Sequence, residues 1–289
     1  MSLVLSSRDQ KNAVSQNKRA IDVHGAIDLS FVYKDGETGL GRLYYRDPLK
    51  VLFPRGDVKT AALVTTGGGL FGGDTYDVDV HFGAHTQALV SAQAAEKVYR
   101  SSGPDCKINV NLKIDEEAVV EWLPQETILF EKARFRRTTK VDFAKGAKGL
   151  VGEMIVFGRL ASGEEVTEGL LREAWEIRNE GKLIWADALH IEGDFQRPLN
   201  HISGFGGARA MATAVYIAHD AEALLETARA LLHQHEDVRM GASCVNGLLI
   251  CRWLAKDPYA LRKAFGAFWS EFRNRALGRV NRLPRLWHC

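Results

Sequence analysis

Apolar and polar residues alternate along much of residues 21–200, with the period of two that is typical of β-strands. The alternation is clearest over 75–82 and over 107–114, where the lysine and asparagine side chains all face away from the apolar side. Asn179-Glu180-Gly181 separates two apolar runs and predicts a hairpin turn. The other predicted strands cover 26–33, 41–45, 48–54, 61–66, 87–91, 94–100, 118–123, 127–130, 141–144, 150–157, 174–177 and 183–191. So many short strands with frequent turns predict a mainly β fold of the sandwich or layered-sheet kind.

The pattern changes in the last part of the chain, residues 201–289, where helical spacing appears. An apolar stripe predicts a helix over 221–233 with Asp220 as its N-cap. Asp257-Pro258 predicts the start of a second helix, whose apolar face contains Leu261, Phe265, Phe268 and Phe272. Residues 242–254 between the helices are predicted to form one buried strand. We therefore expect a smaller α+β C-terminal part with two main helices.

Composition is that of an ordinary soluble globular protein, with 46% hydrophobic and 26% charged residues in a chain of 289. The 38 basic and 36 acidic residues nearly cancel, which predicts no general attraction to nucleic acid or to an anionic membrane. Four cysteines without a CxxC pair suit a reducing compartment, and the longest apolar run, 210–218, is too short to span a bilayer. A cytoplasmic protein is expected. Residues 1–20 are polar and aperiodic, which predicts a disordered lead-in.

One glycine-rich stretch specifies backbone conformation rather than packing. Gly67, Gly69 and Gly72 have the spacing of a dinucleotide-binding fingerprint, which requires a helix after the last glycine. The residues that follow alternate as a strand, so the stretch predicts a tight turn between two strands, and a nucleotide-dependent oxidoreductase remains only as an alternative. Asp74 closes the stretch and shares the phase of the apolar residues after it, which predicts that its side chain points inward.

Two further carboxylates interrupt apolar strands, Glu153 within 150–157 and Asp187 within 183–191. A buried charge is unfavourable unless it is paired or hydrogen-bonded. One interpretation is therefore that each carboxylate forms a salt bridge or lies on the solvent-exposed face of an edge strand. The other is that Asp74, Glu153 and Asp187 line a polar passage through the β core, where isolated carboxylates would bind a divalent cation weakly and release it. The candidate cationic partners for a salt bridge are Lys97, Arg100 and Arg159.

Other chemistry is poorly represented in the sequence. No Gly-x-Ser-x-Gly elbow occurs, and no set of cysteines and histidines has the spacing of a closed metal site, so no catalytic residue is predicted. The basic and aromatic segments 97–100 and 133–137 are expected to lie on the surface or to contact an acidic partner protein, since they are too short for a nucleic-acid footprint.

Five motifs occur in a fixed order along the chain. They are Gly67-Gly68-Gly69-Leu70-Phe71-Gly72-Gly73-Asp74, then Lys97-Val98-Tyr99-Arg100-Ser101, then the block from Glu121-Trp122-Leu123-Pro124 to Phe130, then Gly158-Arg159 with Gly163-Glu164, and finally Leu283-Pro284-Arg285-Leu286-Trp287. Together they resemble the urease accessory protein UreD family, called UreH in some organisms. The resemblance runs from about Ile21 to Trp287.

The resemblance implies one domain over 21–289, with layered or helix-like β-sheets, a few helices, no catalytic activity and no tightly bound cofactor. Members of this family form a complex with UreF and the GTPase UreG on apo-urease and help to deliver nickel through an internal passage with polar and acidic residues. By motif, Asp74, Glu153 and Asp187 fall on such positions and would meet nickel transiently. Glu96 departs from the family pattern, which usually has a small hydroxyl residue there. A β-rich protein-binding module without a metal role is the remaining alternative.

Overall fold

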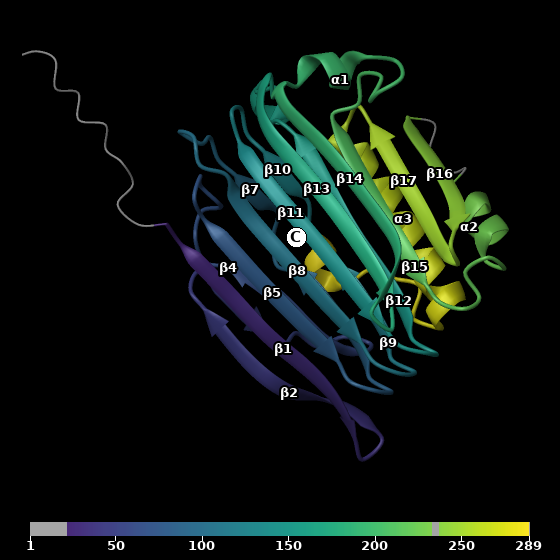
Figure 1. Cartoon of the computed structure of the whole chain (residues 1–289). Coiled ribbons are helices and arrows are strands. Elements are labelled where there is room, and N and C mark those ends of the chain that lie inside the picture. The colour runs from purple at the N-terminus through teal and green to yellow at the C-terminus, as the bar shows by residue number, and fades with distance from the viewer. Residues whose placement is uncertain (1–21, 233–236, 289) are drawn as a thin grey trace, which may run out of the picture.

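Two β-sheets face each other in a computed structural model that describes residues 22–232 and 237–288 (Figure 1). Sheet A contains β1 (His24–Lys34), β2 (Glu37–Arg46), β5 (Thr75–Phe82), β8 (Cys106–Ile114), β11 (Arg134–Phe143), β13 (Glu168–Asn179) and β14 (Lys182–Asp194). Sheet B contains β3 (Leu49–Leu52), β4 (Lys59–Thr65), β6 (Gln87–Ala92), β7 (Glu96–Val98), β9 (Val119–Leu123), β10 (Thr127–Leu129), β12 (Lys148–Phe157), β15 (Ala210–Ile217), β16 (Val238–Val245) and β17 (Leu248–Ala255). The predicted lead-in, residues 1–20, lies outside the described residues.

The chain winds between the sheets, since β5, β8 and β11 lie in sheet A while β6, β9 and β12 lie in sheet B. Neighbouring strands along β1, β5, β8, β11 and β13 are parallel, and so are those along β4, β6, β9 and β12. Parallel neighbours need a long crossover, and here each crossover carries a strand of the opposite sheet. The prediction of a mainly β fold with layered, helix-like sheets is confirmed.

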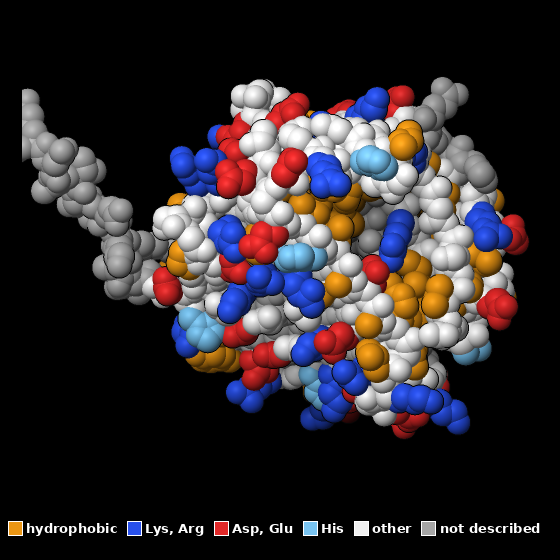
Figure 2. Space-filling model, turned by 45° about the horizontal axis from the view of Figure 1, so that its top comes forward, with side chains coloured by type: hydrophobic (Ala, Val, Ile, Leu, Met, Phe, Trp, Pro, Cys, Tyr) orange, Lys and Arg blue, Asp and Glu red, His pale blue; other side chains and the backbone are white. Residues whose placement is uncertain are grey.

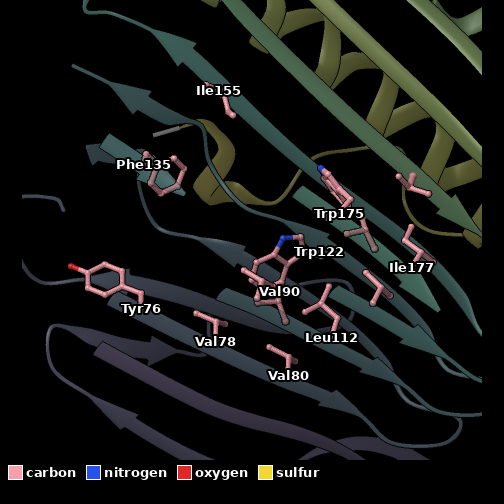
Figure 3. Packing of buried hydrophobic residues seen from close by; sticks show 14 of the residues in the cluster. Tyr76, Val78, Val80, Val90, Leu112, Trp122, Phe135, Ile155, Trp175 and Ile177 are labelled. Atoms are coloured by element: carbon pink, nitrogen blue, oxygen red, sulfur yellow. The ribbon is translucent and has the colours of Figure 1, made fainter. Parts of the chain in front are cut away.

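The main hydrophobic core fills the space between the sheets (Figure 3). Tyr76, Val78 and Val80 of β5 point into it, as the alternation of their sequence predicts. Trp122 of β9 and Trp175 of β13 enter the same layer from opposite sheets.

A second core lies on the outer face of sheet B, which the helix α3 (Pro258–Leu277) covers (Figure 1). Leu150 and Met154 of β12 face this helix, whereas Val151 and Ile155 face sheet A. A strand buried on both faces reads as a continuous apolar run, which is what β12 shows. Gly152 lets the helix approach, because a Cβ there would lie 2.6 Å from Cζ3 of the Trp269 ring.

The C-terminal part joins sheet B through pairing of β15 with β12. The predicted start of α3 is confirmed, since Asp257 accepts hydrogen bonds from the backbone nitrogens of Tyr259 and Ala260. Helix α2 (Leu225–Leu232) begins later than predicted, because Asp220 does not cap it and instead accepts hydrogen bonds from Lys148 Nζ at 2.9 Å and Tyr216 Oη at 2.8 Å.

The predicted strand over 242–254 is wrong, because the segment is a hairpin of β16 and β17. Asn246 and Gly247 form its turn, with φ angles of 50° and 79° that asparagine and glycine tolerate best. The short helix α1 (Gln196–Asn200) and the 3₁₀ turns Leu160–Ser162 and Arg285–His288 complete the described elements. Within the described ranges, none of the helices has the length and apolar character needed to cross a membrane.

Candidate functional site

The glycine stretch forms a turn between β4 and β5, so the helix that a dinucleotide-binding loop requires is replaced by a strand. The turn is held against β7, because Leu70 N donates to Lys97 O and Tyr99 N donates to Leu70 O, both at 2.8 Å. Gly69 has a φ angle of 135°, and a Cβ at this position would clash with the backbone oxygen of Lys97. The glycines therefore allow close approach of two backbones.

Asp74 points inward as predicted and is 1% exposed. Its Oδ1 accepts a hydrogen bond from Val23 N at 3.1 Å, and its Oδ2 accepts one from Phe71 N at 2.9 Å. These contacts give the carboxylate a local structural role, since it ties the glycine turn to the residues that precede β1.

A cavity of about 370 Å³ lies between the sheets behind the glycine turn. Its outer rim is formed by exposed residues, Gly67, Gly68, Gln93 and Lys97. Its polar lining comes chiefly from Thr65, Gln93, Glu96, Lys97, Gln125, Thr127, Arg137 and Glu153. The Trp-Leu-Pro-Gln block lies along the cavity, which Trp122, Pro124 and Gln125 line.

A buried charged cluster closes the inner end of this cavity, where Glu153, Arg137 and Glu173 are each 4% exposed. Arg137 Nη1 lies 2.8 Å from Glu153 Oε2, and Arg137 Nε donates to both carboxylate oxygens of Glu173 at 3.0 and 2.9 Å. The other Glu153 oxygen accepts a hydrogen bond from Trp122 Nε1 at 3.0 Å. Arg137 Nη1 also donates to Thr127 Oγ1 at 2.9 Å. Glu153 comes from β12 of sheet B and its partner from β11 of sheet A, so the cluster joins the sheets.

Burial raises the pKa of both carboxyl groups of the cluster, and the guanidinium of Arg137 offsets only part of this effect. The pKa of Glu173 is raised to about 7, and the negative charges of Glu153 and Asp187 add to the rise. The half-buried Glu96 at the rim has its pKa raised to about 7 by burial, against the opposing effect of a hydrogen bond of 2.7 Å from Thr65 Oγ1. Glu96 and Glu173 therefore have pKa values close to neutral pH, and the pKa of Glu153 is raised in the same direction.

Asp187 lies at the opposite end of the cluster, on the edge strand β14. Its Oδ2 accepts a hydrogen bond from Arg252 Nη2 of β17 at 2.7 Å, and both side chains are partly exposed. The pair links the two sheets where they open to solvent. The structure therefore places Glu153 within the cluster and Asp187 beyond Glu173, whereas Asp74 is not among the residues that line the cavity.

Several of the motif residues form a stack beside the glycine turn. The Phe71 and Tyr99 rings are stacked at 4.7 Å between centroids, and Tyr99 meets the edge of Phe130 at 4.8 Å. The guanidinium of Arg159 lies 4.3 Å from the Phe130 ring centroid and forms an ion pair with Glu164. Segments far apart in the sequence thus meet at one place.

The sequence model described as UreD urease accessory protein matches residues 23–288. The chain belongs to the UreD family. Relatives named urease accessory protein UreD include those of Magnetococcus marinus, 45% identical over 92% of this chain and 94% of the relative, and of Azorhizobium caulinodans, 43% identical over 83% and 86%. The relative from Xanthobacter autotrophicus is 43% identical over 91% of this chain and 89% of its own length.

Two charged residues of this UreD family member were not found from its sequence, Arg137 and Glu173. The segments 97–100 and 133–137 were expected at the surface, and this is wrong for Val98, Ala133, Phe135 and Arg137, which are buried. Phe135 and Arg137 share the inward phase of β11 with Val141. The expected partners of Glu153 were also wrong, since Arg159 pairs with Glu164 and the partner of Glu153 is Arg137. The phase of β11 was the signal that could have found Arg137.

Within the described residues, no group of three or more histidine, cysteine, aspartate or glutamate side chains is arranged to hold a metal ion. The charged cluster instead combines two carboxylates with one guanidinium, so it carries a net charge of −1 when all three groups are ionised. Such a buried excess of negative charge favours uptake of a proton or a cation.

Proposed function

We propose that this chain is a non-catalytic maturation factor of urease, which forms a complex with UreF and the GTPase UreG on apo-urease in the cytoplasm. In this proposal it assists insertion of nickel into the urease active site, and nickel is a transient cargo. Membership of the UreD family supports the maturation role.

The observation that supports the role in metal transfer is a line of carboxylates that runs between the sheets from the cavity to the edge strand β14. Glu96 and Glu153 line the cavity, Glu173 lies beyond Arg137, and Asp187 lies where the sheets open. Oxygen ligands presented one or two at a time bind a divalent cation weakly, which suits a cargo that must be released. Asp74 is a weaker candidate ligand, because its carboxylate already accepts two backbone hydrogen bonds.

The test is activation of urease by Glu153→Gln in the presence of UreF, UreG and nickel. We expect the complex to assemble while the nickel content of urease falls several-fold, because the amide keeps the shape of the side chain but removes its charge. Glu121→Gln is the matched control for loss of one charge from a buried ion pair, since Glu121 is also buried and paired with Arg273 but faces α3 on the other side of sheet B. Asp187→Asn tests the outer end of the line. Full nickel loading with both Glu153→Gln and Asp187→Asn would refute the passage.

A protein-binding module without a metal role is the second candidate, and the surface of β2 favours it. This strand lies at the edge of sheet A and exposes large apolar side chains together with its neighbour β1. They are Val32, Tyr33, Leu40, Leu43, Tyr44 and Tyr45. Acidic and basic side chains are intermingled on the face seen in Figure 2, where hydrophobic side chains also gather in patches. Co-purification with urease, UreF and UreG distinguishes the candidates. A binding module without a metal role requires that Tyr44→Asp abolishes recovery of partners while Glu153→Gln has no effect on nickel content.

A further inference from the structure

The guanidinium of Arg137 is surrounded by oxygen atoms of the kind that bind metal cations. Its nitrogens lie within 3.0 Å of four oxygen atoms, namely Glu153 Oε2, both carboxylate oxygens of Glu173 and Thr127 Oγ1. Carboxylate and hydroxyl oxygens are ligands that hard divalent cations accept in proteins. The guanidinium therefore lies where a metal ion could be bound by the same oxygen atoms.

The same residue lies across the line of carboxylates between the sheets. Glu153 belongs to the wall of the cavity, whereas Glu173 lies on the far side of the guanidinium, toward Asp187. A cation that moved from the cavity toward Asp187 would have to displace the guanidinium, because two positive charges at contact distance repel each other strongly inside a protein. The carboxylates alone thus do not form a continuous path.

The guanidinium has an incomplete set of contacts and space beside it. In the part of the chain that the structure describes, Arg137 Nη2 is buried without a hydrogen-bond partner, although the group retains its other contacts. Glu153 Oε2 likewise accepts no hydrogen bond there, despite its ion pair. The neighbouring cavity of about 370 Å³ is lined by Arg137 itself and is large enough for about ten water molecules. A long arginine side chain could be rehydrated there without leaving the protein.

We propose that Arg137 is a gate residue, whose guanidinium fills the position between Glu153 and Glu173 until a divalent cation takes it. The cation enters from the cavity, the guanidinium moves into the cavity, and the two carboxylates with Thr127 become the ligands. This inference rests on the proposed function for the identity of the cargo, but its electrostatic part depends only on this chain.

The test is binding of Ni²⁺ to the full chain, without urease or other partners, by calorimetry and thermal unfolding. Arg137→Met has similar length and no charge, so it leaves the two carboxylates without their internal cation. We expect one Ni²⁺ per chain with an affinity at least about tenfold above that of the wild type, and a melting temperature that rises with Ni²⁺. Arg137→Lys, which keeps the positive charge, should show neither gain.

Two further variants keep the result decisive. The gain should disappear in Arg137→Met combined with Glu153→Gln and Glu173→Gln, and its persistence there would overturn the proposal because the ion would bind elsewhere. Equal Ni²⁺ affinity in the wild type, Arg137→Lys and Arg137→Met would also overturn it. If Arg137→Met does not fold alone, Ni²⁺ should restore folding to it and to Arg137→Gln, and failure of this rescue in both contradicts the gate.

The outcome is independent of urease activation. A normal nickel content of urease with both Glu153→Gln and Asp187→Asn would refute the passage, even if Arg137→Met gains the Ni²⁺ site. Loss of nickel delivery with Glu153→Gln, but no Ni²⁺ gain in Arg137→Met, would preserve the proposed function and reject the gate.

Discussion

The buried arginine of α3 offers a sharp test of how the helix and the C-terminal residues are held. Arg273 is 1% exposed and donates to both oxygens of Glu121 at 2.8 Å, with a further ion pair to Asp57 at 3.1 Å. It also donates to the backbone oxygens of Val280 and Arg282. Arg273→Met would leave the buried Glu121 carboxylate without its cation, which typically costs about 3–5 kcal/mol. At roughly 2–4 °C per kcal/mol for a chain of this size, the melting temperature should fall by about 6–20 °C.

Thermal and urea unfolding, followed by tryptophan fluorescence, measure the change. Arg275→Met is the matched control on the same helix, because Arg275 forms an exposed pair with Glu271 and should cost less than about 1 kcal/mol. The double variant Glu121→Leu, Arg273→Met removes both charges of this ion pair. It should therefore be more stable than the sum of the two single effects indicates. A loss below about 1 kcal/mol for Arg273→Met, or simple additivity in the double variant, would refute the reasoning.

Three other predictions follow from single residues. The pKa of Glu96 is raised to about 7, so the folded protein binds a proton at this residue more tightly than the unfolded chain does, and the resulting stabilisation is present below pH 4.5 and lost as the pH rises to about 7. Glu96→Gln can still accept a hydrogen bond from Thr65 and should flatten this part of the pH–stability profile. An unchanged profile would contradict the assignment. Gly152→Ala should lower stability by about 1–3 kcal/mol in chemical denaturation, because its Cβ would crowd the Trp269 ring, and a neutral effect would show that α3 moves away freely. Gly69→Ala should cost about 1–3 kcal/mol through its positive φ angle and should increase hydrogen exchange of the Leu70 amide; unchanged exchange would be the opposing result.

Local pattern was sufficient to predict most strands, because in these strands one face is buried and alternation records it. The phase of Asp74 and the hairpin at Glu180 and Gly181 were predicted correctly for the same reason. The hairpin at Asn246-Gly247 was missed because both of its strands are rich in apolar residues, and the continuous run concealed a recognisable turn signal.

The charged cluster required information that a single strand does not contain. Arg137 and Glu173 are direct neighbours in the parallel pairing of β11 and β13, but they are far apart in the sequence. The contact of Arg137 with Glu153 also depends on which face of sheet B meets sheet A. Phase predicts whether a side chain points inward, whereas register and sheet order decide which opposite charge it meets.

The position of α3 has a consequence for the order in which the protein can be completed during synthesis. The strands of sheet B emerge from the ribosome before the helix that covers their outer face, so Leu150 and Met154 have no apolar cover until the last part of the chain is made. Nascent or truncated chains that end before α3 would present this face to other molecules and would be prone to aggregate. Synthesis of α3, rather than formation of the sheets, is then the step that protects the chain from aggregation.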